Sequence, residues 1–348
     1  MQQHKPPRKT KAPSPARPAA PPASPLAAAP GKPDPAPGLG AVLSGAALWH
    51  VHKGDCIEHM AALPPAVFDA AVFSPPFPSV YAYTDSEADI GNSEDLRGDA
   101  KLHLSFFYRQ LARLVKPGRV VMVHVMQIPR MKRAGGRGLH NFRDLNIRLA
   151  ERAGLTYAYD WLVRKNPQAQ AIRNKAWELK FQGVETDRAM ARGTLCDYLL
   201  KLLAPGDNAV PIDSPNQVSR NDWIKWAEGA WFDIKETDTL NGQKALKAAR
   251  GENDTKHICP LQLGVIDRLV RLYSNPDEVV FSPFAGIGSE GVTAVRLGRR
   301  FYGCELKDEY HAAACRHLAA AEEALARGQR GDLFAGVADA DPEPAEVA

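Results

Sequence analysis

The stretch VVFSPFAGIGSEGVTA, residues 279–294, joins an apolar run to a helical pattern through three glycines. Gly286, Gly288 and Gly291 have the spacing G-x-G-x-x-G, in which glycine lets the backbone approach a bound ligand closely. Glu305 ends the next predicted strand, roughly twenty residues after the first glycine, where a carboxylate can accept hydrogen bonds from both hydroxyls of a ribose. The strand, the loop, the helix and the acid together predict a nucleoside cofactor site rather than a tight turn alone.

Strand and helix patterns alternate on both sides of this stretch. Short apolar runs bounded by turn residues predict strands at 47–52, 68–73, 119–125, 156–163, 197–203, 278–281 and 301–304. Helical periodicity and capping residues predict helices at 56–63, 102–115, 144–153, 261–273, 289–297 and 309–324. Such alternation is typical of an α/β domain with a mostly parallel sheet.

Composition divides the chain into five parts. Residues 1–45 are rich in Pro and Ala with interspersed Lys and Arg, which predicts a disordered basic tail, and residues 328–348 predict a disordered acidic tail. The segments 46–203 and 257–327 carry the alternating pattern, whereas residues 204–256 interrupt it and predict an inserted module. The small core expected for this module consists of Trp223, Trp226 and Trp231.

The overall charge and the cysteines limit the classes of function. The net charge of +4 and the isoelectric point near 8.7 permit a polyanionic partner without requiring one. The five cysteines are scattered and none forms a C-x-x-C pair, so the sequence predicts no metal site and no disulfide framework. The chain has no apolar run long enough to span a membrane and no secretory signal, which favours a reducing cytoplasm.

A second motif, FDAAVFSPPF at residues 68–77, ends a buried strand in Ser-Pro-Pro-Phe. Ligands of open α/β sheets lie at this carboxyl edge. The Ser74 hydroxyl and the Pro75 carbonyl can accept hydrogen bonds from an exocyclic base amine, while Pro76 helps to fix the backbone and Phe77 can stack on the base. A base inside a duplex must be flipped out to reach such a pocket. The alternative is a Pro-Pro turn with Phe77 in the core.

Two nucleoside cofactors fit the glycine loop. NAD is the first alternative, but the loop of dinucleotide folds lies near the start of its domain and here it lies near the end. S-adenosylmethionine also needs a ribose acid, has no pyrophosphate, and carries a sulfonium that suits an acidic pocket. The Ser-Pro-Pro-Phe motif favours this methyl donor, while an NAD-dependent oxidoreductase and a non-catalytic DNA-binding protein of the same fold remain as alternatives.

Residues 47–325 resemble the DNA amino-methyltransferases that modify cytosine N4 or adenine N6. The resemblance lies in GDCIEHMAALPPAVFDAAVFSPPF, KHICPLQLGVIDRLV and FSPFAGIGSEGVTAVRLGRRFYGCELKDEY, in the circularly permuted, beta-class-like order that has the catalytic tetrapeptide first. It implies a Rossmann-like S-adenosylmethionine-dependent methyltransferase fold, with a mostly parallel, seven-stranded sheet covered by helices on both faces. It implies catalytic roles for Ser74, Pro75, Pro76 and Phe77. The donor-binding residues that it implies are Asp55, Cys56, His257, Ile258, Phe281, Ser282, Phe284, Ala285, Gly286, Gly288, Ser289, Glu290 and Glu305.

The chain departs from the family pattern at the glycine strand, where most members have Asp-Pro-Phe and this chain has Ser282-Pro283-Phe284. Glu290 is the candidate replacement for the lost carboxylate. The FSPF and GIGSEG pattern is similar to phage and prophage members. Ser at position 74 slightly favours cytosine N4 over adenine N6, because members with Asp or Asn there tend to modify adenine. Methylation of cytosine C5 is disfavoured, because its thiolate comes from a Pro-Cys pair that the chain lacks.

Basic segments near the catalytic motif predict contacts with double-stranded DNA. The stretch IPRMKRAGGRGLHNFR, residues 128–143, is rich in Arg, Lys and Gly, and residues 161–180 add further cations. The residues expected at the DNA are Tyr81, Arg130, Lys132, Arg133, Arg137, Lys165 and Arg173. Residues 84–96 are expected to form a lid, and 204–256 to recognise the target sequence. A separate restriction endonuclease is a further candidate partner, and the sequence leaves the oligomeric state open, with a dimer among the alternatives.

Overall fold

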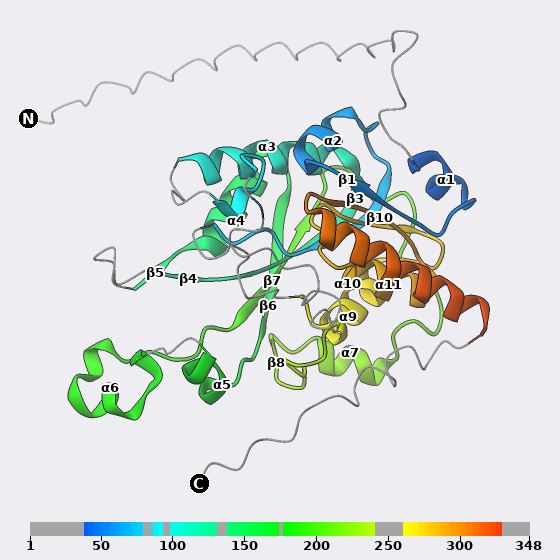
Figure 1. Ribbon diagram of the computed structural model, residues 1–348. Coiled ribbons are helices and arrows are strands. Elements are labelled where there is room, and N and C mark those ends of the chain that lie inside the picture. The colour runs from blue at the N-terminus through cyan, green and yellow to red at the C-terminus, as the bar shows by residue number, and fades with distance from the viewer. Residues whose placement is uncertain are drawn as a thin grey trace, which may run out of the picture. The chain divides into compact units, whose positions relative to one another are not determined.

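The centre of the molecule is a twisted sheet whose strand order is β1-β10-β9-β2-β3-β7-β6-β8 (Figure 1). The computed structural model describes residues 38–78, 84, 86–92, 98–130, 138–173, 177–240 and 260–328. The strands of the sheet are β1 (Trp49–Lys53), β2 (Phe68–Phe73), β3 (Val115–Met126), β6 (Thr156–Val163), β7 (Asp197–Leu203), β8 (Ala230–Trp231), β9 (Val279–Ser282) and β10 (Arg300–Glu305). A separate ribbon pairs β4 (Ile128–Pro129) with β5 (Leu139–His140).

Most neighbouring strands of the large sheet run parallel. The pairs β1–β10, β10–β9, β9–β2, β2–β3 and β6–β8 are parallel, and only β7 runs antiparallel to its neighbours β3 and β6 within the described chain. The mostly parallel sheet predicted from the alternating pattern is therefore confirmed. The sheet has one strand more than the seven expected, because the two-residue strand β8 extends the edge beside β6.

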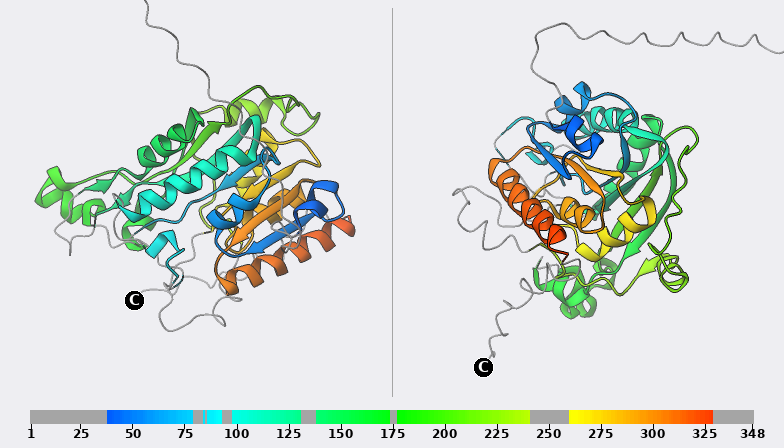
Figure 2. Two further views of the ribbon diagram at one scale, coloured as in Figure 1. Left: turned by 90° about the horizontal axis from the view of Figure 1, so that it is seen from above. Right: turned by 90° about the vertical axis from the view of Figure 1, so that its right-hand side faces the viewer.

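Helices cover both faces of the sheet, as two views at right angles show (Figure 2). On one face, α2 (Cys56–Ala62), α3 (Asp99–Leu114) and α4 (Phe142–Arg152) pack over one hydrophobic cluster. On the other, α9 (Leu263–Tyr273), α10 (Ser289–Arg296) and α11 (Asp308–Ala326) pack over a second. The strand residues alternate between the two clusters, since Val121 and Val123 face the first while Val120 and Met122 face the second.

A short helix lies before the predicted start of the catalytic half at residue 46. Helix α1 (Leu39–Ser44) buries Leu39 and Val42 in the first cluster. The Arg300 guanidinium of β10 donates hydrogen bonds to the carbonyl oxygens of Val42 and Leu43 at 2.5 and 2.6 Å. The sequence analysis missed this helix because its six residues follow directly on the Pro/Ala-rich tail.

The inserted module does not have the tryptophan core that was predicted for it. Trp226, at the end of α7 (Arg220–Trp226), and Trp231 of β8 are buried in the second cluster with Trp161 of β6. The indole N–H groups of Trp161 and Trp231 both donate to the Trp226 carbonyl, at 3.0 and 3.1 Å. Trp223 is half exposed. Trp226 and Trp231 therefore pack in the core of the main domain rather than in a separate core of their own.

Short helical pieces connect β6 to β7. Where this connection is described, its pieces are α5 (Pro167–Arg173), α6 (Phe181–Thr186) and two single 3₁₀ turns, and they extend away from the sheet in Figure 1. Within the described residues, no helix has both the length and the apolar character that a membrane crossing needs.

Replacing Gly291 by Ala is expected to destabilise the fold by about 1–3 kcal/mol, the usual cost of overpacking. A Cβ atom at this position would lie 2.6 Å from Phe301 Cδ1 and 2.8 Å from Leu318 Cδ2, so α10 could not keep its distance from β10 and α11. Chemical unfolding would measure the change. Gly40→Ala is the control, because a Cβ atom there meets nothing within 4 Å, and equal stability of the two variants would contradict the packing argument.

Candidate functional site

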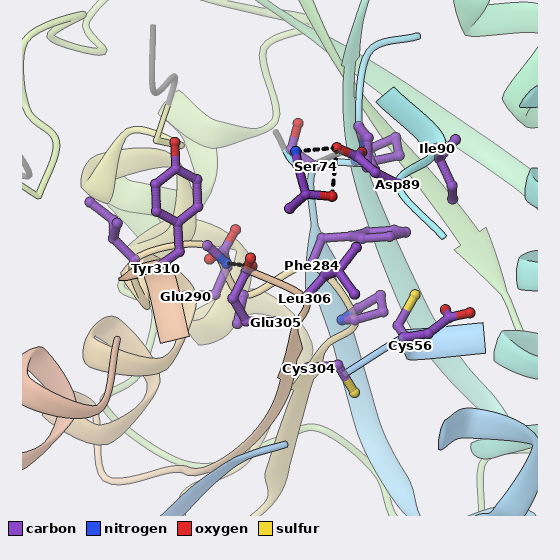
Figure 3. Close-up of a pocket in the computed structure, with 18 of the residues that line it drawn as sticks. Cys56, Ser74, Asp89, Ile90, Phe284, Glu290, Cys304, Glu305, Leu306 and Tyr310 are labelled. Carbon is purple, nitrogen blue, oxygen red and sulfur yellow. Dashed lines mark hydrogen bonds between the residues drawn. The ribbon is translucent and has the colours of Figure 1, made fainter. Parts of the chain in front are cut away.

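A cavity opens at the carboxyl ends of four adjacent parallel strands, β1, β10, β9 and β2 (Figure 3). Backbone segments that follow these strands form its wall, as expected for an open α/β sheet. Figure 3 shows Glu290 and Glu305 on one side, Ser74 and Asp89 on the other, and Phe284 between them. The two predicted motifs, which lie far apart in the sequence, therefore meet in one cavity.

The glycine loop is held in place by Glu305. The backbone N–H groups of Gly286 and Lys307 donate to the two carboxylate oxygens of Glu305, at 2.8 and 2.9 Å. Gly286 has a φ of 54°, and a Cβ atom added there would meet no protein atom within 4 Å. Burial raises the pKa of Glu305 to about 7, although these hydrogen bonds favour its ionised form. Glu305 therefore positions the loop and at the same time lines the cavity beside it.

Glu290 is a buried acid in the first turn of α10, and its residue is 4% exposed. Burial raises the pKa of Glu290 to about 8, and the nearby Glu305 contributes to this increase. None of the described Lys and Arg side chains forms an ion pair with it. A buried carboxyl group without a cation is costly once it ionises, so this side chain is suited to a ligand that brings a positive charge.

Two more acids complete the wall. Asp55 caps α2 by accepting a hydrogen bond from the Ile57 N–H at 2.8 Å. Asp89, which is 5% exposed, accepts hydrogen bonds from the N–H groups of Thr84 and Gly91 at 2.7 and 2.9 Å. With Glu290 and Glu305 they give the cavity four carboxyl groups. A cationic group fits such a wall better than a phosphate does.

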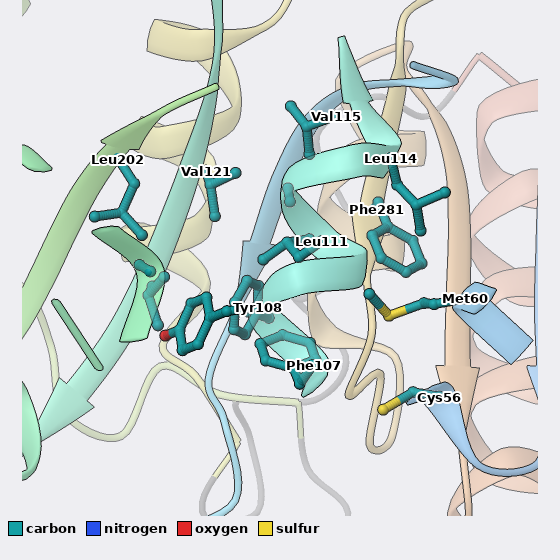
Figure 4. Packing of buried hydrophobic residues seen from close by; sticks show 14 of the residues in the cluster. Cys56, Met60, Phe107, Tyr108, Leu111, Leu114, Val115, Val121, Leu202 and Phe281 are labelled. Carbon is teal, nitrogen blue, oxygen red and sulfur yellow. The ribbon is translucent and has the colours of Figure 1, made fainter. Parts of the chain in front are cut away.

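Cys56 separates the cavity from the core beneath α3. It lines the cavity and also belongs to the first hydrophobic cluster, near Met60 in Figure 4. Burial raises the pKa of its thiol well above the ordinary value. The thiol is therefore a small packing group rather than a nucleophile.

The Ser-Pro-Pro-Phe tetrapeptide lies across the cavity from the glycine loop. Ser74, Pro75, Pro76 and Phe77 all line the cavity. The Ser74 hydroxyl donates to the backbone carbonyl of His124 at 3.2 Å and lies 3.1 Å from His124 Nδ1. The Phe77 ring is 8% exposed, and its centroid lies 5.6 Å from that of Phe142. Phe77 packs in the core, as the Pro-Pro turn alternative predicted, and it also forms part of the cavity wall, as a ring that stacks on a base would.

Most of the predicted donor-site residues in the described chain line the cavity. Those that do are Asp55, Cys56, Phe284, Ala285, Gly286, Ser289, Glu290 and Glu305. His257 and Ile258 lie outside the described residues. The residues that the sequence analysis missed are Gly54, Thr84, Ala88, Asp89, Ile90, Pro260, Leu261, Pro283, Ile287, Cys304, Leu306 and Tyr310. Most of them flank a predicted motif in the sequence, so proximity to a motif is the signal that could have identified them.

Three predicted donor-site residues, Phe281, Ser282 and Gly288, do not line the cavity. Phe281 stacks on Phe68 in the core, with ring centroids 4.2 Å apart. Ser282 is fully buried, and its hydroxyl has no hydrogen-bond partner in the described chain. Gly288 has a φ of 91°, and a Cβ atom there would lie 3.2 Å from Ala314 Cα of α11. The absence of a side chain at Gly288 therefore allows α10 and α11 to approach each other closely.

The described structure tests few of the predicted DNA contacts. Tyr81, Lys132, Arg133, Arg137 and the side chain of Arg173 lie outside the described residues. Arg130 is exposed, and its Nε donates to the Leu139 carbonyl at 3.2 Å. Lys165 forms an ion pair with Asp197 at 2.6 Å, and its side chain is only 15% exposed. Lys165 is thus engaged within the protein rather than presented at its surface.

A sequence profile of one family, described as DNA methylase (N6_N4_Mtase), matches residues 68–316. Two curated relatives match over shorter segments. YubD of Escherichia coli (strain K12) is 41% identical over 64 residues, or 18% of this chain and 28% of YubD. The type II methyltransferase M1.MboII of Moraxella bovis is 41% identical over 54 residues, or 16% of this chain and 21% of M1.MboII. The aligned segments thus span less than a third of either relative.

Solved structures share the fold over most of the chain. The cytosine-N4-specific PvuII DNA methyltransferase aligns with a TM-score of 0.57 at 17% identity, over 81% of this chain and 94% of that one. TTHA0409 of Thermus thermophilus, solved in complex with S-adenosyl-L-methionine, aligns with a TM-score of 0.58 at 22% identity, over 78% and 93% of the two chains. At these identities the likeness concerns the fold, and it confirms the α/β methyltransferase fold expected from the sequence.

Proposed function

Because this chain belongs to the DNA methylase family, we propose that it transfers a methyl group from S-adenosylmethionine to an exocyclic amine of a flipped DNA base. One observation carries the proposal: Ser74-Pro75-Pro76-Phe77 and the glycine loop line the same cavity. An acceptor for a base amine and a site for a nucleoside therefore lie side by side. S-adenosylmethionine would supply an electrophilic methyl group there.

The residues of the cavity fit this donor. Glu305 lies where a ribose acid is expected, and the loop at Gly286 leaves room for a ligand beside the backbone. Ser282 is buried behind the cavity wall and has no carboxylate, whereas Asp55 and Glu290 line that wall with their carboxyl groups. Glu290 would hold the ammonium group of the donor. A buried carboxyl group with a raised pKa is suited to this role, because it gains its missing cation when the donor binds.

On the other side of the cavity the tetrapeptide would hold the target amine. An amine conjugated with a base ring is a weak nucleophile, and acceptors on its N–H groups make its lone pair more available. Ser74 Oγ and the Pro75 carbonyl are such acceptors. The two prolines fix their directions in advance, so little reorganisation is needed when the base enters.

Finer features of the proposal rest on the sequence. Ser at position 74 slightly favours cytosine N4 over adenine N6. The tetrapeptide precedes the glycine loop in the chain, which supports the circularly permuted class, and the loop sequence supports a phage-like origin. The enzyme would act alone or beside a restriction endonuclease. Residues 204–256 remain the candidate segment for recognition of the target sequence. The basic residues around 128–143 remain the candidates for contacts with DNA phosphates.

Transfer of a labelled methyl group from S-adenosylmethionine to mixed genomic DNA tests the function directly. We expect label in the exocyclic amines of one base, and single-molecule sequencing of host DNA with and without the gene would identify that base and its recognition site. Failure to bind the donor in calorimetry, with binding of NAD instead, would favour the oxidoreductase. Retention of DNA without donor binding would favour a non-catalytic DNA-binding protein.

A further inference from the structure

Three polar side chains extend from Ser74 into the interior of the sheet. His124 lies near the end of β3, Asp197 begins β7, and Lys165 follows β6. His124 Nδ1 lies 3.1 Å from Ser74 Oγ, and His124 Nε2 lies 2.9 Å from Asp197 Oδ2. Lys165 Nζ lies 2.6 Å from the same carboxylate oxygen. Neither the family match nor the tetrapeptide motif assigns a role to these residues.

The sheet register brings the three residues together. Met126 of β3 is opposite Asp197 of β7, so His124 precedes this pair by two residues and points to the same face. Val163 of β6 is also opposite Asp197, and Lys165 follows it by two residues. The antiparallel position of β7 is thus what places a carboxylate behind His124. The side chains of His124, Asp197 and Lys165 are 12%, 3% and 15% exposed.

The charges around His124 determine where its proton lies. Burial alone would raise the pKa of Asp197, but His124 and Lys165 outweigh it and lower that pKa, so the carboxylate is ionised. An ionised carboxylate beside Nε2 favours the tautomer with hydrogen on Nε2. The Nε2 contact does not satisfy strict hydrogen-bond geometry, so it is mainly electrostatic. Nδ1 is then the bare nitrogen that faces Ser74.

The hydroxyl proton of Ser74 is consequently directed away from the cavity. Its two acceptors are the His124 carbonyl at 3.2 Å and His124 Nδ1 at 3.1 Å, and both belong to the same residue. The lone pairs of Oγ are then left for the N–H groups of a target amine. His124 therefore determines that Ser74 acts as an acceptor rather than as a donor toward the cavity.

We propose that His124 and Asp197 form a proton relay behind Ser74, which first orients its hydroxyl group and then receives the proton that the methylated amine must lose. The proposal rests on the proposed methyl transfer. When the new N–C bond forms, the amine becomes a cation. Its N–H bond breaks as Ser74 Oγ takes the proton, and the former Oγ–H proton moves to His124 Nδ1. The imidazolium formed between Ser74 and Asp197 later releases one proton to water.

The single-turnover transfer rate tests this relay. With donor and DNA both saturating, His124→Gln should lower this rate by roughly 100-fold, the lower limit for a positioned acid–base group. Asp197→Asn should also slow transfer, because the anion that favours hydrogen on Nε2 is lost. The donor Kd should change by less than about twofold in both variants, because neither side chain lines the donor side of the cavity.

A control variant and a measurement that does not depend on activity distinguish failure of the relay from failure of the proposed methyl transfer. His103→Gln, on α3 and away from the cavity, should leave the transfer rate unchanged. Nitrogen NMR of labelled histidine should show His124 protonated at Nε2, and Ser74→Ala should shift the Nδ1 signal. An unchanged transfer rate in His124→Gln, or hydrogen on Nδ1 in the wild-type protein, would overturn the relay. Absence of transfer by the wild-type protein would instead overturn the proposed function, and the NMR result would still decide the tautomer.

Discussion

Ser74→Ala is expected to lower methyl transfer by about 100- to 1,000-fold, the range observed when one preorganised stabilising group is removed from an active site. The substitution removes the Oγ acceptor for the target amine and also breaks the contact with His124 at 3.1 Å. The Pro75 carbonyl remains, so residual transfer above background is expected. Single-turnover assays with labelled donor would measure the loss.

Donor binding and folding should be unaffected in this variant. Ser74 lies across the cavity from Glu290 and Glu305, and its loss leaves the glycine loop intact. Donor affinity measured by calorimetry should therefore match the wild-type value. Ser105→Ala, an exposed position on α3, is the matched control and should keep full transfer. Equal rates in the wild-type protein and in Ser74→Ala would rule out the tetrapeptide as the holder of the amine.

The sheet and its main site were predictable because their signals are local. Apolar runs such as Phe68–Phe73, which is buried at every position, and the glycine spacing at 286–291 identify strands and a loop without knowledge of their neighbours. Since parallel strands end at a common edge, the meeting of Ser74 with Glu305 also follows from the strand order. Predicting these features required only the periodicity of the apolar residues and the rule that ligands of open sheets lie at the carboxyl ends of the strands.

Other features depended on contacts between distant segments. Asp89 lies in a polar stretch that suggests a loop, and its hydrogen bonds to the N–H groups of Thr84 and Gly91 help to hold it in the cavity wall. Phe281 is adjacent to the donor motif, yet strand alternation turns its ring into the core against Phe68. His124 was part of an ordinary apolar strand, and its role emerges only from the pairing of β3 with β7. Sequence periodicity carries no information about such partners.

Glu290→Gln is expected to weaken donor binding by roughly tenfold to a hundredfold at pH 8.5, because a hydrogen bond to a charged group contributes about 1.5–3 kcal/mol. Burial raises the pKa of Glu290 to about 8 in the free protein. A cationic donor binds the ionised form, so wild-type affinity should fall as the pH drops below about 8 and Glu290 becomes protonated. Isothermal titration calorimetry between pH 6 and pH 9 would measure this dependence.

Glu290→Gln should abolish the change in donor affinity near pH 8. Any change in affinity near pH 7 should remain, because the pKa of Glu305 is raised to about 7 in the same cavity. Wild-type binding at pH 7 should release a proton, which buffers of different ionisation enthalpy would reveal, and the variant should release less. Glu323→Gln, an exposed position on α11, is the matched control.

Stability gives an independent check on the same side chain. A raised pKa in the folded state means that the contribution of Glu290 to stability is lost as the pH rises from its unfolded value toward 8. Without donor, Glu290→Gln should therefore be at least as stable as the wild-type protein at pH 9, where the buried carboxylate is ionised. A variant that is weaker in donor binding but not in folding would show that Glu290 serves the ligand rather than the core. If affinity and its pH dependence were both unchanged, Glu290 could not be the substitute for the carboxylate missing at Ser282.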